Sequence, residues 1–95
     1  DGKEPLLISI NKSNIRFEEF DKPESLRVLS THSLTSSFKS GVEHYDRDRF
    51  KIVFFFKPSG AIYFRKVIDL AKEYGFEVGY DPIEESQNII FSLPD

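Results

Sequence analysis

The stretch from residue 50 to residue 85 predicts a complete strand–helix–strand unit, and this unit constrains the fold more than any other part of the chain. Residues 52–56 form an uninterrupted apolar run of β-branched and aromatic side chains, which is short enough for a strand. Such a run is typical of a strand buried on both faces. Pro58 and Gly60 then interrupt it, and we expect Ser59 to cap a helix that begins near Gly60.

The segment after Gly60 has the periodicity of an amphipathic helix. Its apolar side chains recur every three or four residues and its charged ones fall largely elsewhere, so one face should pack and the other be solvated. Gly75 is a favourable left-handed terminator, and residues 76–80 then alternate in polarity as a half-buried strand does, with Asp81 and Pro82 ending it. Loops this short predict either a right-handed crossover or a split unit with another strand inserted. The apolar helical positions are Tyr63, Phe64, Val67, Ile68, Leu70, Ala71 and Tyr74.

The N-terminal part of the chain predicts a hairpin. Two β-prone runs, residues 6–10 and 15–20, flank the polar turn 11–14. Ile8 and Ile10 fall on one face of the first run, as expected where one side of a sheet covers a core. The same holds for Ile15 and Phe17 in the second run.

Residues 21–45 combine one ambiguous segment with one clear helix. Residues 26–29 are compatible with a short extended segment, which we favour, or with a helix capped by Asp21 that carries Pro23 in its first turn. Leu34, Phe38, Val42 and Tyr45 then follow at steps of four, four and three, which predicts a helix from about residue 33 to residue 44.

A final strand is expected over residues 88–92. The whole sequence, residues 1–95, therefore predicts a single α+β domain. Its mixed sheet should have four or five strands, with both helices packed on one face and the other face partly open.

Length and composition exclude several function classes. Ninety-five residues hold one core, which is too little for separate cofactor and substrate lobes. The absence of cysteine excludes a disulfide framework, a thiolate metal site and a cysteine nucleophile. A net charge of −3 argues against non-specific binding of nucleic acid.

Neither a membrane-length apolar segment nor a signal peptide is visible in the sequence, and composition leaves the compartment open. Because the chain begins with Asp1 and not Met, we expect it to be part of a longer protein.

One local cluster offers metal ligands or acid–base groups. In principle its carboxylates and imidazole suit a metal-dependent hydrolase or nuclease. Consecutive loop residues point in different directions, however, and the acids from residue 46 on alternate with Arg47 and Arg49, which is typical of a solvated loop. The cluster consists of Glu43, His44, Asp46 and Asp48.

Three further features have both a functional and a structural interpretation. His32 lies among serines and threonines, but no Gly-x-Ser-x-Gly elbow marks a nucleophile. Residues 57–60 join a strand to a helix start, yet they lack the glycine pattern of a phosphate loop. The adjacent aromatics of residues 54–56 are better suited to a core than to base stacking, although Phe55 is a candidate for an apolar docking patch.

The order of these elements resembles the soluble domain of the ExbD/TolR family. Residues 51–60, Tyr63 and residues 75–79 contribute to the likeness, and Val67, Asp69, Ala71 and Gly75 match that family's helix pattern V-x-D-x-A-x-x-x-G. The likeness covers roughly residues 6–81. Pro58, the three phenylalanines 54–56 and the tail 83–95 depart from the family pattern.

The resemblance implies a domain anchored by one N-terminal membrane helix and associated with a proton-driven motor. It also implies dimerisation, contact with a cell-envelope component, and a periplasmic or membrane-anchored location. The family's proton-carrying aspartate lies in the membrane helix, which is not part of this sequence, so Asp69 matches only a helix-surface position.

These observations predict a non-enzymatic interaction domain that docks a protein partner or a second copy and holds neither cofactor nor metal. The alternatives are a cytoplasmic adaptor or regulatory domain and, third, the small hydrolase built on His44. The predicted partner contacts are Ile8, Ile10, Phe17, Phe55, Ile89 and Phe91.

Overall fold

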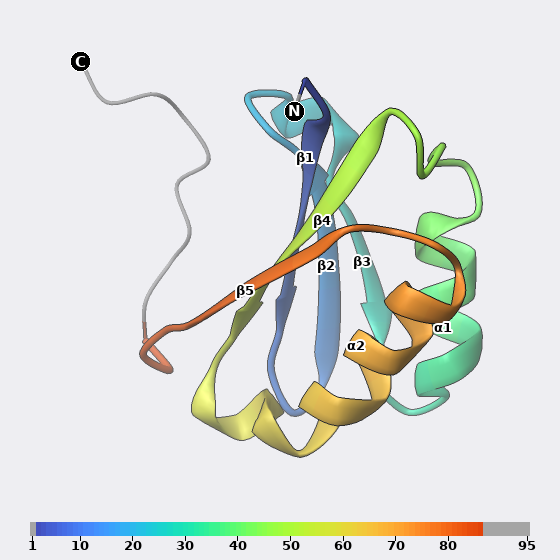
Figure 1. The fold of residues 1–95 in the computed structure, drawn as a ribbon. Coiled ribbons are helices and arrows are strands. Elements are labelled where there is room, and N and C mark those ends of the chain that lie inside the picture. The colour runs from blue at the N-terminus through green and yellow to red at the C-terminus, as the bar shows by residue number, and fades with distance from the viewer. Residues whose placement is uncertain (1, 87–95) are drawn as a thin grey trace.

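A computed structural model describes residues 2–86 and shows an α+β fold (Figure 1). Its strands are β1 (Glu4–Ile10), β2 (Asn14–Glu19), β3 (Arg27–Ser30), β4 (Phe50–Phe56) and β5 (Val78–Pro82). Its α-helices are α1 (Leu34–Val42) and α2 (Phe64–Glu73), and its 3-10 helices are η1 (Pro23–Ser25) and η2 (Pro58–Tyr63).

The five strands form one mixed sheet in the order β3-β2-β1-β4-β5. β1 pairs antiparallel with β2, and β2 pairs antiparallel with β3. β4 lies parallel to β1 on one side and parallel to β5 on the other. Both helices cover the same face of the sheet, as the sequence predicted (Figure 1).

The predicted hairpin is confirmed, and its turn has a specific cause. The Asn11 side-chain oxygen accepts hydrogen bonds from the backbone N–H groups of Ser13 and Asn14, at 2.8 and 2.7 Å. This Asx-type turn replaces the backbone pairing that the chain reversal removes. The register then places Ile8 opposite Phe17 and Ile10 opposite Ile15, all on the helix-covered face.

β4 alternates between buried and half-buried side chains, so the prediction that it is buried on both faces is wrong. Ile52, Phe54 and Phe56 lie beneath the helices, whereas Val53 and Phe55 point to the opposite face and are half-buried. The reason is that, within residues 2–86, both crossover helices lie on one side of the sheet and none lies on the other.

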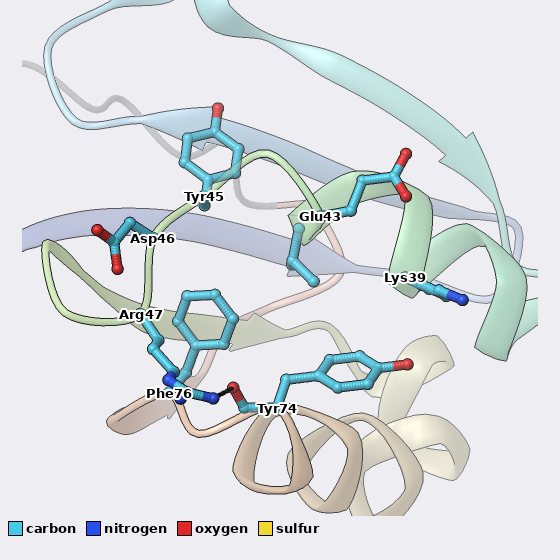
Figure 2. A pocket seen from close by; sticks show the side chains of 8 residues that line it. Lys39, Glu43, Tyr45, Asp46, Arg47, Tyr74 and Phe76 are labelled. Atoms are coloured by element: carbon cyan, nitrogen blue, oxygen red, sulfur yellow. Dashed lines mark hydrogen bonds between the residues drawn. The ribbon is translucent and has the colours of Figure 1, made fainter.

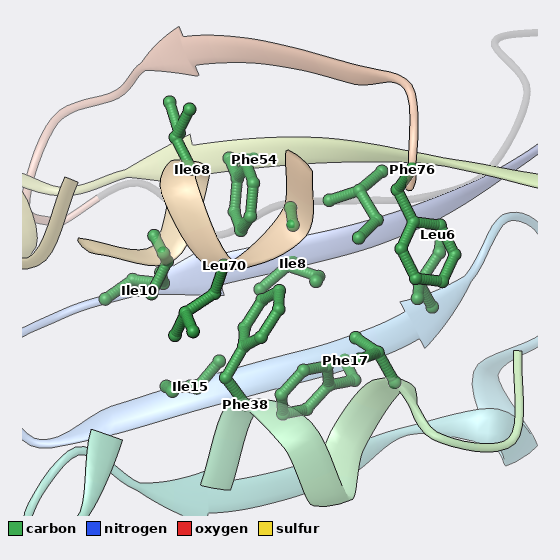
Figure 3. Packing of buried hydrophobic residues seen from close by; sticks show 14 of the residues in the cluster. Leu6, Ile8, Ile10, Ile15, Phe17, Phe38, Phe54, Ile68, Leu70 and Phe76 are labelled. Carbon is green, nitrogen blue, oxygen red and sulfur yellow. The ribbon is translucent and has the colours of Figure 1, made fainter. Parts of the chain in front are cut away.

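The core lies between the helix-covered face of the sheet and the two helices (Figure 3). Phe38 of α1 is fully buried, and its ring centroid lies 6.4 Å from that of Phe17 and 6.0 Å from that of Phe54. Val67 and Leu70 of α2 close the other end of the layer. The apolar stripes predicted for both helices pack on the core as expected, but Tyr45 follows α1 and Tyr63 precedes α2 instead of lying within them.

The connection between β4 and α2 differs from the prediction. The chain first makes η2, so α2 begins at Phe64 and not near Gly60. Ser59 makes no side-chain capping bond within this helix, so its predicted capping role is wrong. A Cβ at Gly60 would overlap the carbonyl oxygen of Ile10, so this turn packs against the end of β1 in a way only glycine permits.

The remaining elements follow the sequence with small shifts. The extended segment that we favoured forms β3, and Gly75 has the positive φ, 87°, of the expected terminator. β5 covers residues 78–82 and so includes Asp81 and Pro82, because Phe76 is taken into the core before the strand begins. β5 pairs directly with β4, which excludes an inserted strand there. The strand expected over residues 88–92 lies outside the described residues.

Candidate functional site

An open pocket lies where the C-terminal ends of α1 and α2 approach the loop before β4 (Figure 2). Its volume is about 370 Å³. The floor is apolar and the rim carries charges of both signs, which suits an amphipathic group better than a single ion. The lining residues are Lys39, Val42, Glu43, Tyr45, Asp46, Arg47, Tyr74 and Phe76.

Two of the charged residues of this pocket have structural roles. The Arg47 guanidinium donates to the carbonyl oxygen of Tyr74 at 3.4 Å, which satisfies a carbonyl at the end of α2. A Cβ at Gly75 would lie 2.7 Å from the Arg47 side chain, so glycine also makes room for that arginine. The Asp46 carboxylate accepts from the backbone N–H of Asp48 at 2.8 Å and so fixes the loop.

The cluster considered for hydrolysis is not assembled around this pocket. Glu43 and Asp46 line it, but His44 and Asp48 do not. The His44 side chain is 76% exposed, and its Nε2 lies 3.7 Å from a Glu43 carboxylate oxygen. Within residues 2–86, no three potential ligands come together to hold a metal ion. Only two of the four residues of the cluster therefore share the pocket, and the described residues do not bring them together as a metal site.

The contacts of His32 are those of a local turn and not of a catalytic acid–base pair. It lies in the exposed turn before α1, and its backbone N–H donates to the Ser30 hydroxyl at 3.0 Å. This is the local bonding of a turn, and it gives no support to the triad considered for the sequence.

A separate polar contact links Tyr45 to the sheet. The Tyr45 hydroxyl donates to a Glu19 carboxylate oxygen at 3.2 Å. Burial raises the pKa of Tyr45 above its ordinary value, and the Glu19 charge and hydrogen bond raise it further. The contact holds the loop after α1 against β2 and is structural.

The predicted partner contacts divide between the two faces of the sheet. Ile8, Ile10 and Phe17 are fully buried beneath the helices, so the prediction that a partner contacts these side chains is wrong. They alternate correctly, but the face on which they lie is the one the helices cover. Phe55 lies on the opposite face. Ile89 and Phe91 lie outside the described residues.

We call the side of the sheet that carries no helix of residues 2–86 the open face. Its apolar side chains are those of Leu7, Val28, Val53 and Phe55; Leu7 is buried, Val53 and Phe55 are half-buried, and Val28 is 49% exposed. Sequence reasoning missed Val28 and Val53, although their alternation with the buried residues was the signal that would have found them. Its charged side chains are those of Arg16, Glu18, Lys51, Glu77 and Asp81.

An apolar groove lies beside β5 on the helix-covered side. Phe56 and Phe64 form its floor, with ring centroids 4.7 Å apart, and Tyr80 stands edge-on to Phe64 at 4.9 Å. Its volume is about 250 Å³, and Pro82 and Ile83 form its far wall. Tyr80 is 57% exposed. Sequence reasoning assigned Phe56 and Phe64 to the core and Tyr80 to a half-buried strand, so it did not identify this groove.

The segment after β5 is held against the turn after β4. The Glu85 carboxylate accepts from the Ser59 backbone N–H at 2.8 Å and from its hydroxyl at 2.7 Å. The same hydroxyl oxygen accepts from the Lys12 backbone N–H at 3.1 Å. The Ser59 hydrogen bonds, assisted by the charges of Lys57 and Lys12, lower the pKa of Glu85. Ser59 therefore joins three segments.

Comparison with protein-family models, with curated proteins and with solved structures finds no match to this chain. The resemblance to the ExbD/TolR family stays a prediction from the residues that carry it. Among the helices of residues 2–86, none has both the length and the apolar composition needed to span a membrane.

Proposed function

We propose that this chain is a non-enzymatic interaction domain that acts by docking, and that a second copy of the chain binds its open face. The observation that carries the proposal is the one-sided covering of the sheet. Among residues 2–86, both helices pack on the face of Phe54, while the opposite face carries no helix and includes the half-exposed Val28. Exposed apolar patches on a protein surface mark interaction sites when they are contiguous and rimmed by polar residues.

The charges of the open face support a second copy as the occupant. Arg16 and Lys51 are basic, and Glu18 and Asp81 are acidic, so the face carries both signs around its apolar centre. Two such faces related by a twofold axis are able to place opposite charges against each other. A partner with a single strong charge would match this face less well.

The resemblance to ExbD/TolR soluble domains extends the proposal to a cellular role. In that role the domain is tethered to a membrane by a segment outside this sequence and works beside a motor complex, touching envelope components. The described fold supports it only in general form, as a hairpin followed by two helices on one side of a mixed sheet. The cytoplasmic adaptor remains the alternative.

Measurement of mass in solution tests the proposal. Light scattering on wild-type protein across a wide concentration range should show a shift from monomer to dimer. Phe55→Lys should remove the dimer, because it places a charge at the centre of the open face. Lys66→Glu, a charge change on the exposed side of α2, serves as the control and should leave the dimer intact. A strict monomer at every concentration contradicts the proposal.

A further inference from the structure

The outer edge of β5 is the feature that the proposed function leaves unused. In the part of the chain that the structure describes, no strand pairs with this edge. On its inner side, the carbonyl oxygen of Glu77 accepts from Ile52 N–H, and the Ile83 N–H donates to Phe56, both at 2.9 Å. Alternate residues of a parallel strand bond to the same neighbour, so Val78 and Tyr80 direct their backbone groups outward. Such an edge is a template for an added strand.

Hollows lie on both faces of this edge. On the helix-covered side is the apolar groove of Phe56, Phe64 and Tyr80. On the open face a second hollow of about 450 Å³ lies over Gly79, where a Cβ would meet nothing within 4 Å. Successive side chains of an added strand point to opposite faces. An added strand would therefore place one side chain in the groove and the next over Gly79.

The charges of this edge specify the kind of strand. Basic side chains are absent from residues 77–86, so the outermost part of the described sheet is acidic. Glu77 and Asp81 flank Gly79 at alternate positions of the chain, so their side chains fall on the same, open face; Glu77 also lines the hollow. Glu77 is 53% exposed and lies 3.6 Å from Lys3, while Lys51 lines the inner wall of the hollow. The acidic side chains are those of Glu77, Asp81, Glu84 and Glu85.

We infer that the outer edge of β5 binds an extended segment of a partner protein in which basic residues alternate with an apolar residue. The apolar side chain enters the groove beside Tyr80. The flanking basic side chains lie over Gly79 with their charges toward Glu77 and Asp81. Backbone hydrogen bonds to Val78 and Tyr80 hold the segment.

Two other occupants fit this edge less well. Pairing of β5 with β5 of a second copy would bring the Asp81 carboxylates of both copies close together, which is unfavourable. The sequence of residues 87–95 contains Ile89, Ile90 and Phe91 but no basic residue to meet Glu77 and Asp81. The acidic edge therefore favours a basic partner.

The test uses the full chain labelled with ¹⁵N and titrated with a synthetic peptide, acetyl-Lys-Ile-Lys-Ile-Lys-amide. The amide signals of residues 78–82 should shift saturably, and a peptide with glutamate in place of lysine should bind far more weakly. Asp81→Lys should weaken binding about threefold to tenfold, because an exposed attraction becomes a repulsion. Asp48→Lys carries the same charge change in a distant loop and should leave affinity unchanged. Equal loss in both variants would show non-specific attraction and overturn the inference.

A pair of substitutions at Tyr80 tests the strand geometry. Tyr80→Val removes the ring but keeps the outward N–H, whereas Tyr80→Pro removes both without touching the bonds to β4. Tyr80→Pro should bind the peptide about fivefold more weakly than Tyr80→Val, the effect of one lost hydrogen bond. Equal affinities would contradict strand addition.

A variant truncated after Ser86 tests whether residues 87–95 occupy the edge of β5. It should bind the peptide as the full chain does, and a large gain in affinity would show that residues 87–95 occupy the edge instead. The inference does not rest on the open-face dimer. If the chain forms the open-face dimer but does not bind the peptide, only the inference about the β5 edge is overturned. If the chain is a monomer and binds the peptide, only the proposed function is overturned.

Discussion

Phe54 and Phe55 are neighbours in one strand, yet they lie in different environments. Phe54 is fully buried and stacks on Phe38 beneath the helices, while Phe55 lies half-buried on the open face. The difference comes from the pleat of β4 and from the placement of both helices on one side. Residues of the same type thus differ in burial according to the face of the sheet on which they lie.

The largest expected effect compares the two phenylalanines directly. Phe54→Ala should lower the free energy of unfolding by about 3–5 kcal/mol, since it leaves a cavity in the core. Phe55→Ala should cost about 1 kcal/mol, because only part of its ring is removed from water. Urea denaturation followed by circular dichroism measures both. Equal losses would mean that the two faces are buried alike.

Gly41, on the helix-covered side of the sheet, and Gly79, on the open face, extend this comparison of the two faces. A Cβ at Gly41 would overlap the Phe17 ring, so Gly41→Ala should lower the free energy of unfolding by about 1–3 kcal/mol. Gly79 lies on the open face with free space above it, so Gly79→Ala should raise stability by about 0.4–1 kcal/mol. Thermal unfolding of both variants checks the opposite signs, and destabilisation by Gly79→Ala would show that the hollow is filled.

A smaller effect on the free energy of unfolding is expected at Ser59, which links the turn after β4 to Lys12 in the hairpin turn and to Glu85 after β5. Ser59→Ala removes the hydroxyl that contacts Lys12 N–H and the Glu85 carboxylate. It should cost about 0.5–1.5 kcal/mol, as a lost hydrogen bond does. Ser36→Ala on the exposed side of α1 is the matched control and should be neutral or slightly stabilising. If the two variants behave alike, Ser59 is not the junction inferred from its bonds.

The smallest expected effect is the pH dependence of the Glu85 contact. Because its pKa is lowered in the folded state, its contribution to stability is present above the unfolded pKa of about 4.3 and is lost as pH falls through the folded pKa. Carboxyl ¹³C titration should place the Glu85 pKa below its ordinary value. Ser59→Ala should move it upward, whereas Ser36→Ala should not. An unchanged pKa in Ser59→Ala would contradict the assigned cause.

Local periodicity was sufficient to predict most elements of this fold. The hairpin, the two helical stripes and the strand of residues 52–56 each carry their signal within a short segment. What failed depended on contacts between distant segments. Ser59 looked like a helix cap, but its hydroxyl bonds to Lys12 and Glu85, which lie 47 and 26 residues away in the chain.

Surfaces were harder to predict than elements, because period-2 alternation separates two faces without saying which one helices will cover. Ile8 and Phe17 were assigned correctly to one face, but that face is the core. The groove of Phe56, Phe64 and Tyr80 joins a strand end, a helix start and an edge strand, and no single segment contains its pattern. The two helices, whose side is set by the topology of the sheet, determine which face of the sheet a partner can reach.

The most direct test of the account is a concentration series of ¹⁵N-resolved spectra of the wild-type chain. Self-association through the open face predicts concentration-dependent shifts at Val28, Val53 and Phe55, with the core-facing Phe54 and the exposed side of α2 much less affected. Shifts confined to the helices, or spectra that do not change with concentration, would contradict the claim that the face of the sheet opposite α1 and α2 is the docking surface.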